Sequence, residues 1–395
     1  MDEIFAKINS EINIKRYKRE YMAHFEVLRD TIFTALKKNQ TFAALYNGNY
    51  LRGSYADNLK VKYPNEYDLV FRLKLPEEKR ILVVKDKKIP GNVKLDLSEV
   101  LHVIINQKQH VNTYKQLKKM VTSESLLSIQ LLQSWLESCF TKALDDINKK
   151  IIYNDITTTL SYSKQGPAHT ISVKEPYMYS VDFVPAIVLI SSKAILPSIS
   201  KNWDAIPKPL KFIHSDTSFR ASYDNLENEM IKNKNNLKNA LRIIKKFRDI
   251  HTNMHNLKSY YIKTLFLWRA SREPEKFWYQ PIGFVVIQLF TDLSNSLEMC
   301  KLPFYWDPKL NLYEQIGESG LTDIRRCVQS KKKILENYIR LKVRTEVDHL
   351  KVYKTFLTIT ELKENGLIKS SAIPEDKSPE KIELKSSEPR RCIIQ

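Results

Sequence analysis

The sequence is short of glycine, with 8 glycines among 395 residues, and it contains no glycine-rich phosphate-binding loop. Its four cysteines, Cys139, Cys300, Cys327 and Cys392, are far apart, so they predict neither a zinc site nor a disulfide framework, and they suit a reducing compartment. Also missing are an apolar run near the roughly 20 residues that span a bilayer and the apolar core of a signal peptide. These absences predict a cytoplasmic protein that binds no zinc.

Basic residues are in large excess. The chain has 64 Lys and Arg against 45 Asp and Glu, which gives a formal net charge of +19. Such an excess favours a polyanionic partner, either nucleic acid, nucleotides or an anionic membrane surface. The alternative is a soluble protein that is merely basic, and charge alone does not separate the two.

Hydrophobic periodicity divides the chain into four parts. Residues 1–40 are predicted to form one long helix, because apolar residues recur at three- and four-residue spacing. Residues 41–215 alternate between strand-like and helical patterns, and residues 216–365 are almost entirely helical. Residues 366–395 are rich in Ser, Pro, Lys and Glu and predict a disordered tail. The sequence therefore predicts an α/β (α+β) protein with a mixed-sheet half and a helical half, and the first helix spans both.

Three acidic residues stand out in strand-like surroundings. Glu66 and Asp68 are two residues apart in a strand, so their side chains point to the same face. Asp182 lies in the apolar segment YSVDFVPAI, where an unpaired acid would cost several kcal/mol. A shared site for Mg²⁺ or Mn²⁺ explains all three, because hard cations prefer oxygen ligands. The alternative is that Glu66 and Asp68 form a solvated strand face and that Asp182 pairs with a lysine.

A Gly-Ser pair precedes these acids. Gly53 and Ser54 at a strand end can offer a hydroxyl and backbone N–H groups to a triphosphate. Gly-Ser, then Glu-x-Asp, then a distant Asp in an apolar strand is the pattern of the nucleotidyltransferase superfamily that includes DNA polymerase beta. The segments GSYADNLKVKYPNEYDLVFRLKLP, SVDFVPAI, SFRASYDNLENEMI and KSYYIKTLFLW resemble those of cyclic GMP–AMP synthase-like receptors of the Mab-21 group, in the same order.

This resemblance implies a fold and a set of roles. The fold would be a bilobal nucleotidyltransferase with a mixed-sheet catalytic lobe, a helical C-terminal lobe and a long N-terminal spine helix. Glu66, Asp68 and Asp182 would hold the metals, and Asp182 would help to deprotonate the attacking hydroxyl. Nucleotide contacts would come from Ser54, Arg220, Ser222, Glu227, Lys245, Ser259 and Tyr260. Taken singly, Tyr260 is also explained as a core aromatic, Arg220 as a surface ion pair and Lys245 as a solvated charge.

The chain departs from vertebrate members of this family in lacking their zinc-binding cluster of one His and three Cys. That cluster helps to read duplex DNA, so its absence favours double-stranded RNA over DNA as the activator, as in insect members. Duplex RNA is read mainly through its shape and backbone. The basic residues expected to track that backbone are Lys15, Lys18, Arg19, Lys234, Lys238 and Arg242. Activator-bound homodimers are plausible by resemblance.

The last four residues, CIIQ, match the motif for farnesylation of Cys392. A single lipid anchors weakly, so we expect reversible membrane association. A chance ending of four residues is the alternative.

The function expected from these features is synthesis of a cyclic dinucleotide such as cyclic GMP–AMP from ATP and GTP, in innate immune signalling. Two alternatives stay open: a synthase of linear oligonucleotides, and a non-catalytic Mab-21-like scaffold that binds nucleic acid.

Overall fold

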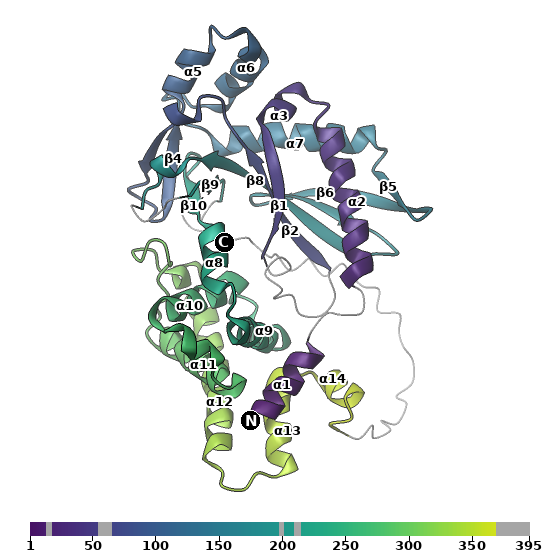
Figure 1. Ribbon diagram of the computed structural model, residues 1–395, viewed down its shortest axis with the longest axis vertical. Coiled ribbons are helices and arrows are strands. Elements are labelled where there is room, and N and C mark those ends of the chain that lie inside the picture. Colours follow the sequence, from purple (N-terminus) through teal and green to yellow (C-terminus); the bar gives the residue numbers. More distant parts are fainter. Residues whose placement is uncertain (13–17, 54–64, 197–200, 209–214, 369–395) are drawn as a thin grey trace. The chain divides into compact units, whose positions relative to one another are not determined.

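A computed structural model describes residues 1–12, 18–53, 65–196, 201–208 and 215–368 (Figure 1). Contacts divide the chain into two compact units. The sheet unit comprises Ile14–Met230 and Pro303–Asn311, and the helical unit comprises Met1–Asn13, Ile231–Leu302 and Leu312–Gln395. Among the helices in these described ranges, none combines the length and apolar character needed to cross a membrane.

The sheet unit is built on a mixed sheet. Its strands are β1 (Tyr46–Arg52), β2 (Glu66–Leu73), β3 (Leu82–Lys85), β4 (Asn92–Asp96), β5 (Lys150–Tyr153), β6 (Ile156–Gln165), β7 (Ala168–Val173), β8 (Tyr179–Leu189), β9 (Trp203–Ile206) and β10 (Phe219–Ser222). Eight of them follow the order β3-β4-β10-β9-β8-β7-β6-β5. β2 joins this sheet by pairing in parallel with β8, and β1 pairs antiparallel with β2. Strands far apart in the sequence, β2 and β8, are thereby direct neighbours.

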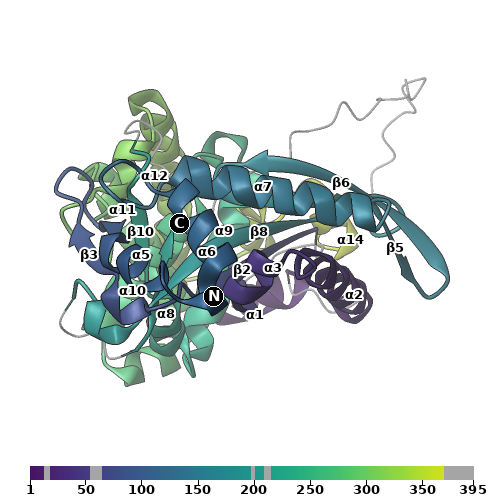
Figure 2. The ribbon, with the colours of Figure 1, turned by 90° about the horizontal axis from the view of Figure 1, so that it is seen from above.

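Helices cover one face of this sheet (Figure 2). The helices of the unit are α2 (Lys18–Leu36), α3 (Gln40–Leu45), α5 (Ser98–Ile104), α6 (Val111–Met120), α7 (Ile129–Asp146) and α8 (Asp224–Ile231). Short 3-10 turns are η1 (Glu78–Arg80), η2 (Lys108–His110) and η3 (Ser191–Lys193). Phe25 of α2, Phe140 of α7 and Phe71 of β2 belong to one buried core. Since successive strand residues alternate between faces, the opposite face of β2 is left for polar side chains.

The helical unit contains α1 (Asp2–Glu11), α9 (Asn235–Ile250), α10 (Ser259–Arg272), α11 (Ile282–Glu298), α12 (Glu318–Arg340), α13 (Glu346–Phe356) and α14 (Ile359–Glu364). Its 3-10 turns are η4 (Thr252–Met254), η5 (Glu275–Tyr279) and η6 (Leu312–Gln315). Phe5 of α1 packs edge-on against Phe356 of α13, with 5.3 Å between ring centroids. Phe247 of α9 packs against Phe290 of α11 at 4.9 Å. Aromatic packing between helices distant in sequence therefore builds this core.

The predicted mixed α+β class is confirmed. Over residues 1–40, expected to form one helix that spans both halves, the structure describes α1 and α2, and residues 13–17 lie outside the described residues. The two helices belong to different units because Phe5 is buried in the helical core and Phe25 in the core of the sheet unit. Phe219–Ser222, expected to open the helical half, form β10, because all four residues are buried and pair with β9 and β4. The units accordingly divide at Met230, beyond the boundary expected at residue 215.

Two buried histidines make the stability of the sheet unit depend on pH. His24 stacks on Tyr177 and contacts the Tyr179 hydroxyl at 2.8 Å, and burial lowers its pKa to about 4. His169 contacts the Tyr162 hydroxyl at 2.8 Å, and burial lowers its pKa to about 3. In the unfolded chain a histidine has a pKa near 6.5. Below that pH the unfolded state therefore binds protons at these two positions, whereas the folded state leaves both histidines neutral.

We therefore expect the free energy of unfolding to fall as the pH drops from about 6.5 to 4.5. The slope should approach about 1.4 kcal/mol per pH unit for each of the two histidines. Denaturant unfolding at several pH values measures this slope, and His169→Phe, which keeps an aromatic ring on Phe140, should make it shallower. A slope unchanged by that substitution would contradict the assignment.

Candidate active site

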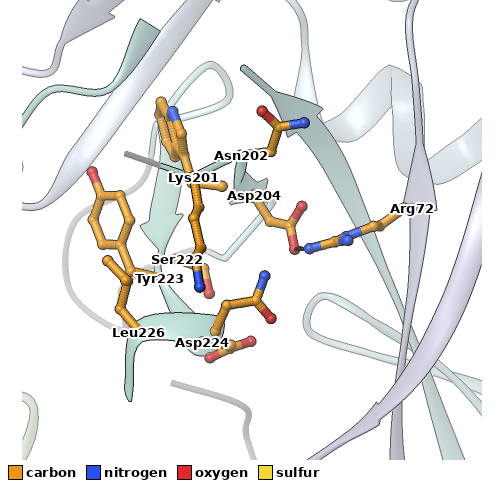
Figure 3. A pocket seen from close by; sticks show the side chains of 10 residues that line it. Arg72, Lys201, Asn202, Asp204, Ser222, Tyr223, Asp224 and Leu226 are labelled. Atoms are coloured by element: carbon orange, nitrogen blue, oxygen red, sulfur yellow. Dashed lines mark hydrogen bonds and ion pairs between the residues drawn. The ribbon is translucent and has the colours of Figure 1, made fainter. Parts of the chain in front are cut away.

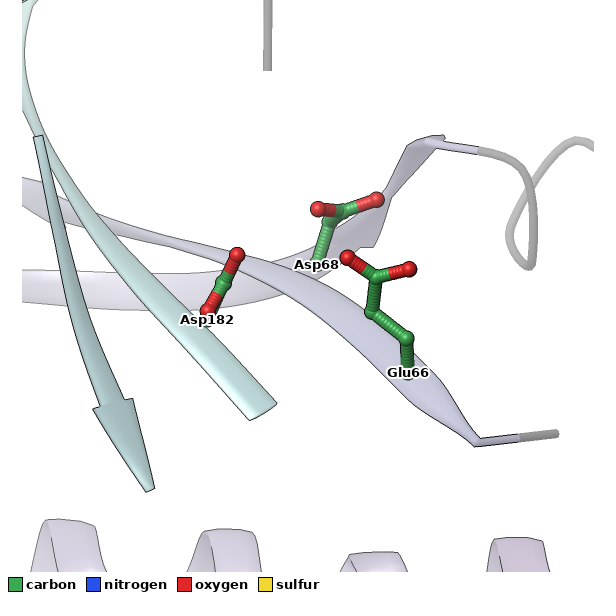
Figure 4. Close-up of side chains that lie close together, drawn as sticks. All are labelled: Glu66, Asp68 and Asp182. Carbon is green, nitrogen blue, oxygen red and sulfur yellow. The ribbon is translucent and has the colours of Figure 1, made fainter. Parts of the chain in front are cut away.

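Three carboxylates converge on the open face of the sheet (Figure 4). Glu66 and Asp68 lie on β2, and Asp182 lies directly opposite Asp68 in the parallel pairing with β8. One oxygen from each of the three side chains lies within 4.8 Å of the others. Asp68 is buried, whereas Glu66 and Asp182 are partly exposed. The structure thus brings together the three acids that the sequence predicted would share a site.

Alternation along the strands explains this placement. Tyr67 and Leu69 point into the core on the covered face, so Glu66 and Asp68 must point to the other face. On the neighbouring strand β7, Thr170 donates its hydroxyl hydrogen to Asp182 Oδ1 at 2.6 Å, which orients that carboxylate. Three carboxylates this close repel one another, and a hard divalent cation with oxygen ligands fits their donor set.

Gly53 lies against this cluster. Arg52, the residue before it, pairs with Asp68 in the β1–β2 ladder. Gly53 has a φ of +71°, and a Cβ built on it would lie 2.0 Å from Asp68 Oδ2. Only glycine fits this position, both for its left-handed backbone and for the close approach of the carboxylate. Ser54, the predicted phosphate ligand, lies outside the described residues.

A polar hollow, which we call the Asp204 hollow, lies in the same unit (Figure 3). It is lined by Arg72, Lys201, Asn202, Trp203, Asp204, Ser222, Tyr223, Asp224, Asn225 and Leu226. Arg72 donates to Asp204 Oδ2 from Nε at 3.2 Å and from a terminal nitrogen at 3.0 Å. Arg52 forms an ion pair with Asp224, and both side chains are almost fully buried. The backbone of Arg52 is in register with that of Asp68, and its side chain pairs with Asp224 of the hollow.

Tyr50 joins the two carboxylates of this hollow. Its hydroxyl lies 2.9 Å from Asp204 Oδ2 and 3.4 Å from Asp224 Oδ2. Burial first, and then the two carboxylates, raise the pKa of Tyr50 far above its ordinary value, so it stays a hydrogen-bond donor. Sequence reasoning missed this network. Asp204 carried the same signal as Asp182, since it is an acid within the apolar strand Trp203–Ile206.

The predicted nucleotide contacts fall in both units. In the sheet unit, Ser222 lines the Asp204 hollow, and buried Arg220 donates from Nε to Asn92 Oδ1 at 2.6 Å. Glu227 is fully buried and accepts a hydrogen bond from Trp306 Nε1 at 2.9 Å. Arg220 is therefore no surface ion pair.

The helical unit holds the other three predicted contacts, whose roles stay predictions. Lys245 is buried on α9, so it is not a solvated charge. Ser259 begins α10 and accepts a hydrogen bond from the guanidinium of Arg248 at 2.6 Å. Tyr260 is partly exposed, whereas its neighbour Tyr261 is completely buried.

The predicted nucleic-acid surface is described only in part. Lys15 lies outside the described residues, as do the side chain of Lys18 and the proposed lipidation site Cys392. Arg19 is exposed at the start of α2. Lys234 and Lys238 are half-buried, and so is Arg242, which donates to Asn239 and whose pKa is lowered by burial. The stripe on α9 is thus less exposed than its spacing suggested.

Comparison with known proteins identifies the family. The family model of the Mab-21 protein nucleotidyltransferase domain matches residues 55–233, and that of the Mab-21 protein HhH/H2TH-like domain matches residues 236–330. The chain is 45% identical over 339 residues to the cyclic GMP-AMP synthase-like receptor of Lucilia cuprina, covering 85% of this chain and 92% of that protein. It is 38% identical to cyclic GMP-AMP synthase-like receptor 1 of Drosophila erecta, covering 80% and 75%. For the receptor of Aethina tumida the identity is 31%, covering 83% and 86%.

These matches include the segment that carries the acidic cluster, and they agree with the two units of the fold. The protein therefore belongs to the Mab-21 family and is a cyclic GMP–AMP synthase-like nucleotidyltransferase.

Proposed function

We propose that this protein uses Mg²⁺ or Mn²⁺ to join ATP and GTP into a cyclic dinucleotide such as cyclic GMP–AMP, as a signal in innate immunity. The observation that carries the proposal is the convergence of Glu66, Asp68 and Asp182, in a chain of this family. Relatives with extensive sequence identity bear the name cyclic GMP-AMP synthase-like receptor, which supports the choice of product.

The three acids have distinct parts in this proposal. Glu66, Asp68 and Asp182 would hold the cations, which would neutralise triphosphate charge and lower the pKa of a ribose hydroxyl. Asp182 accepts the proton of that hydroxyl, with its carboxylate oriented by Thr170. The remainder of catalysis is the positioning of two nucleotides, which requires a rigid sheet rather than a loop.

We further propose that duplex RNA activates the enzyme, with duplex DNA the less favoured trigger. The net charge of +19 supports a polyanionic activator, and the absence of a Cys-rich cluster in the sequence argues against the DNA-reading device of vertebrate members. Exposed Arg19, together with Lys15 and Lys18, belongs to the surface proposed to follow the RNA backbone. Binding of the activator by two copies of the chain is part of this proposal.

Product analysis tests the proposed function. The full chain is incubated with radiolabelled ATP and GTP, with Mg²⁺ or Mn²⁺, and with no nucleic acid, duplex RNA or duplex DNA. We expect a phosphatase-resistant product that requires duplex RNA.

The control arms separate the alternatives. A variant with Lys15, Lys18 and Arg19 all changed to Glu should lose stimulation by RNA. Phosphatase-sensitive oligomers would instead identify a synthase of linear products. RNA binding without any product would favour a non-catalytic scaffold.

A further inference from the structure

The connection between α12 and α13 exposes a group of apolar side chains. Ile339, Leu341, Val343 and Val347 are 45%, 37%, 80% and 62% exposed. Figure 1 shows this connection at the lower end of the helical unit. Exposed apolar residues scattered singly are ordinary, but this group falls within residues 339–347 and forms a patch of the kind that marks a binding surface. We call residues 339–347 the α12–α13 surface.

Basic side chains alternate with the apolar ones in the α12–α13 surface. Arg340, Lys342 and Arg344 are exposed, and Glu346 is the one acid in this stretch of sequence. An alternation of this kind matches the boundary of an anionic bilayer. Apolar side chains reach below the headgroups there, while cations stay at the level of the lipid phosphates.

Contacts within the helical unit hold this connection in shape. The guanidinium of Arg344 lies over the ring of Tyr338, 5.0 Å from its centroid, and its Nε donates to the Tyr338 carbonyl at 3.3 Å. Thr345 caps α13, because its hydroxyl accepts from the backbone N–H of Asp348 at 3.3 Å and its own N–H donates to the Asp348 carboxylate at 3.1 Å. The exposed valines therefore stand on a fixed turn, so that binding would order little additional chain.

We propose that the α12–α13 surface binds membranes rich in anionic lipids. Val343 and Val347 enter the headgroup region, and Arg340 and Lys342 pair with lipid phosphates. Two other occupants fit this surface less well. The phosphate backbone of RNA would partner the cations but leave the valines in water, and a second copy of the chain would place like charges opposite one another.

This inference depends neither on nucleotidyl transfer nor on lipidation. It does bear on the lipidation proposed for Cys392, since a single prenyl chain anchors weakly and stable attachment needs a second contact with the membrane. The α12–α13 surface would provide that second contact.

Sedimentation of the full chain with lipid vesicles tests this proposal. The protein is produced in a bacterium, which attaches no prenyl group, so that only its own surface is measured. It should bind vesicles of phosphatidylcholine with phosphatidylserine much more tightly than vesicles of phosphatidylcholine alone. Arg340→Gln combined with Lys342→Gln should weaken this binding about tenfold or more, and Val343→Gln combined with Val347→Gln should weaken it about tenfold.

Matched variants separate this surface from charge and exposure in general. Lys118→Gln combined with Lys119→Gln removes the same two charges from exposed positions of α6. Ile359→Gln changes an apolar residue that is 67% exposed at the start of α14. Both controls should bind anionic vesicles as the wild type does. All of these variants change exposed side chains, so each should keep the thermal stability and the nucleotidyl transfer of the wild type.

Three results would overturn the inference. The first is that the wild type binds anionic vesicles no better than neutral ones, or that both surface variants bind them as the wild type does. The second is that the α6 control loses as much binding as Arg340→Gln with Lys342→Gln, which would indicate attraction by net charge alone. The third is that this pair of substitutions weakens binding of duplex RNA and leaves vesicle binding unchanged, which would assign the surface to nucleic acid.

Discussion

Replacing Asp68 with Asn is expected to slow nucleotidyl transfer strongly and at the same time to stabilise the protein in the absence of divalent cations. Asp68 is the most buried of the three acids, and ligand oxygens of all three lie within 4.8 Å of one another. Without a cation the carboxylates repel, so an amide in place of one of them relieves that repulsion. With the cation, losing a charged ligand should slow the reaction about a thousandfold, which corresponds to about 4 kcal/mol in the barrier.

Thermal unfolding with and without Mn²⁺ measures the second effect. Mn²⁺ should raise the unfolding temperature of the wild-type protein. In chelator the Asp68→Asn variant should unfold at a higher temperature than the wild type, and Mn²⁺ should raise that temperature only a little. Asp155→Asn makes the same chemical change at an exposed acid in the turn between β5 and β6, and it should behave as the wild type does. Retention of the full Mn²⁺ shift in Asp68→Asn would show that these acids do not form the cation site.

Gly53→Ala is expected to lower activity about a hundredfold or more. Backbone strain from an alanine with a positive φ would by itself cause a smaller loss of activity. The added Cβ would lie 2.0 Å from Asp68 Oδ2, so either the carboxylate or the end of β1 must move. A displacement near 1 Å at a catalytic group suffices for a loss of about this size.

Gly48→Ala, within β1, is the matched control for Gly53→Ala, which directly follows that strand. Gly48 has a φ of +87°, but nothing lies within 4 Å of the position that an added Cβ would take, so its substitution produces backbone strain alone. Both variants should lose about 1 kcal/mol of stability or more. Steady-state rates and the Mn²⁺-induced thermal shift should separate them, because only Gly53→Ala disturbs Asp68. Equal activity in the two variants would exclude a role for this close approach.

The sequence predicted the acidic cluster because the required information is local. A two-residue spacing places Glu66 and Asp68 on one strand face, and an acid in an apolar strand singles out Asp182. Resemblance to a family supplied the expectation that these two strands meet. Their parallel register, with Asp68 opposite Asp182, became visible only in the fold.

The sequence could single out Asp204 as an acid in an apolar strand, but it could not show which residues Asp204 meets. The residues that line the Asp204 hollow come from β2, β9, β10 and the start of α8, and their partners Tyr50 and Arg52 come from β1. Periodicity within one segment does not identify a partner more than a hundred residues away. α1 and α2 have the same helical periodicity, so only the fold shows that different cores bury them.

By itself, the sequence determined the chemical character of the protein: a basic chain, two acids on one strand face, a third acid in an apolar strand and a Gly-Ser pair before them. The tertiary structure decided which of these groups meet, because strand pairing joins residues that are distant along the chain. It also decided which polar atoms are buried, since Asp204 and Ser222 lose contact with water only when β9 and β10 pair within the sheet.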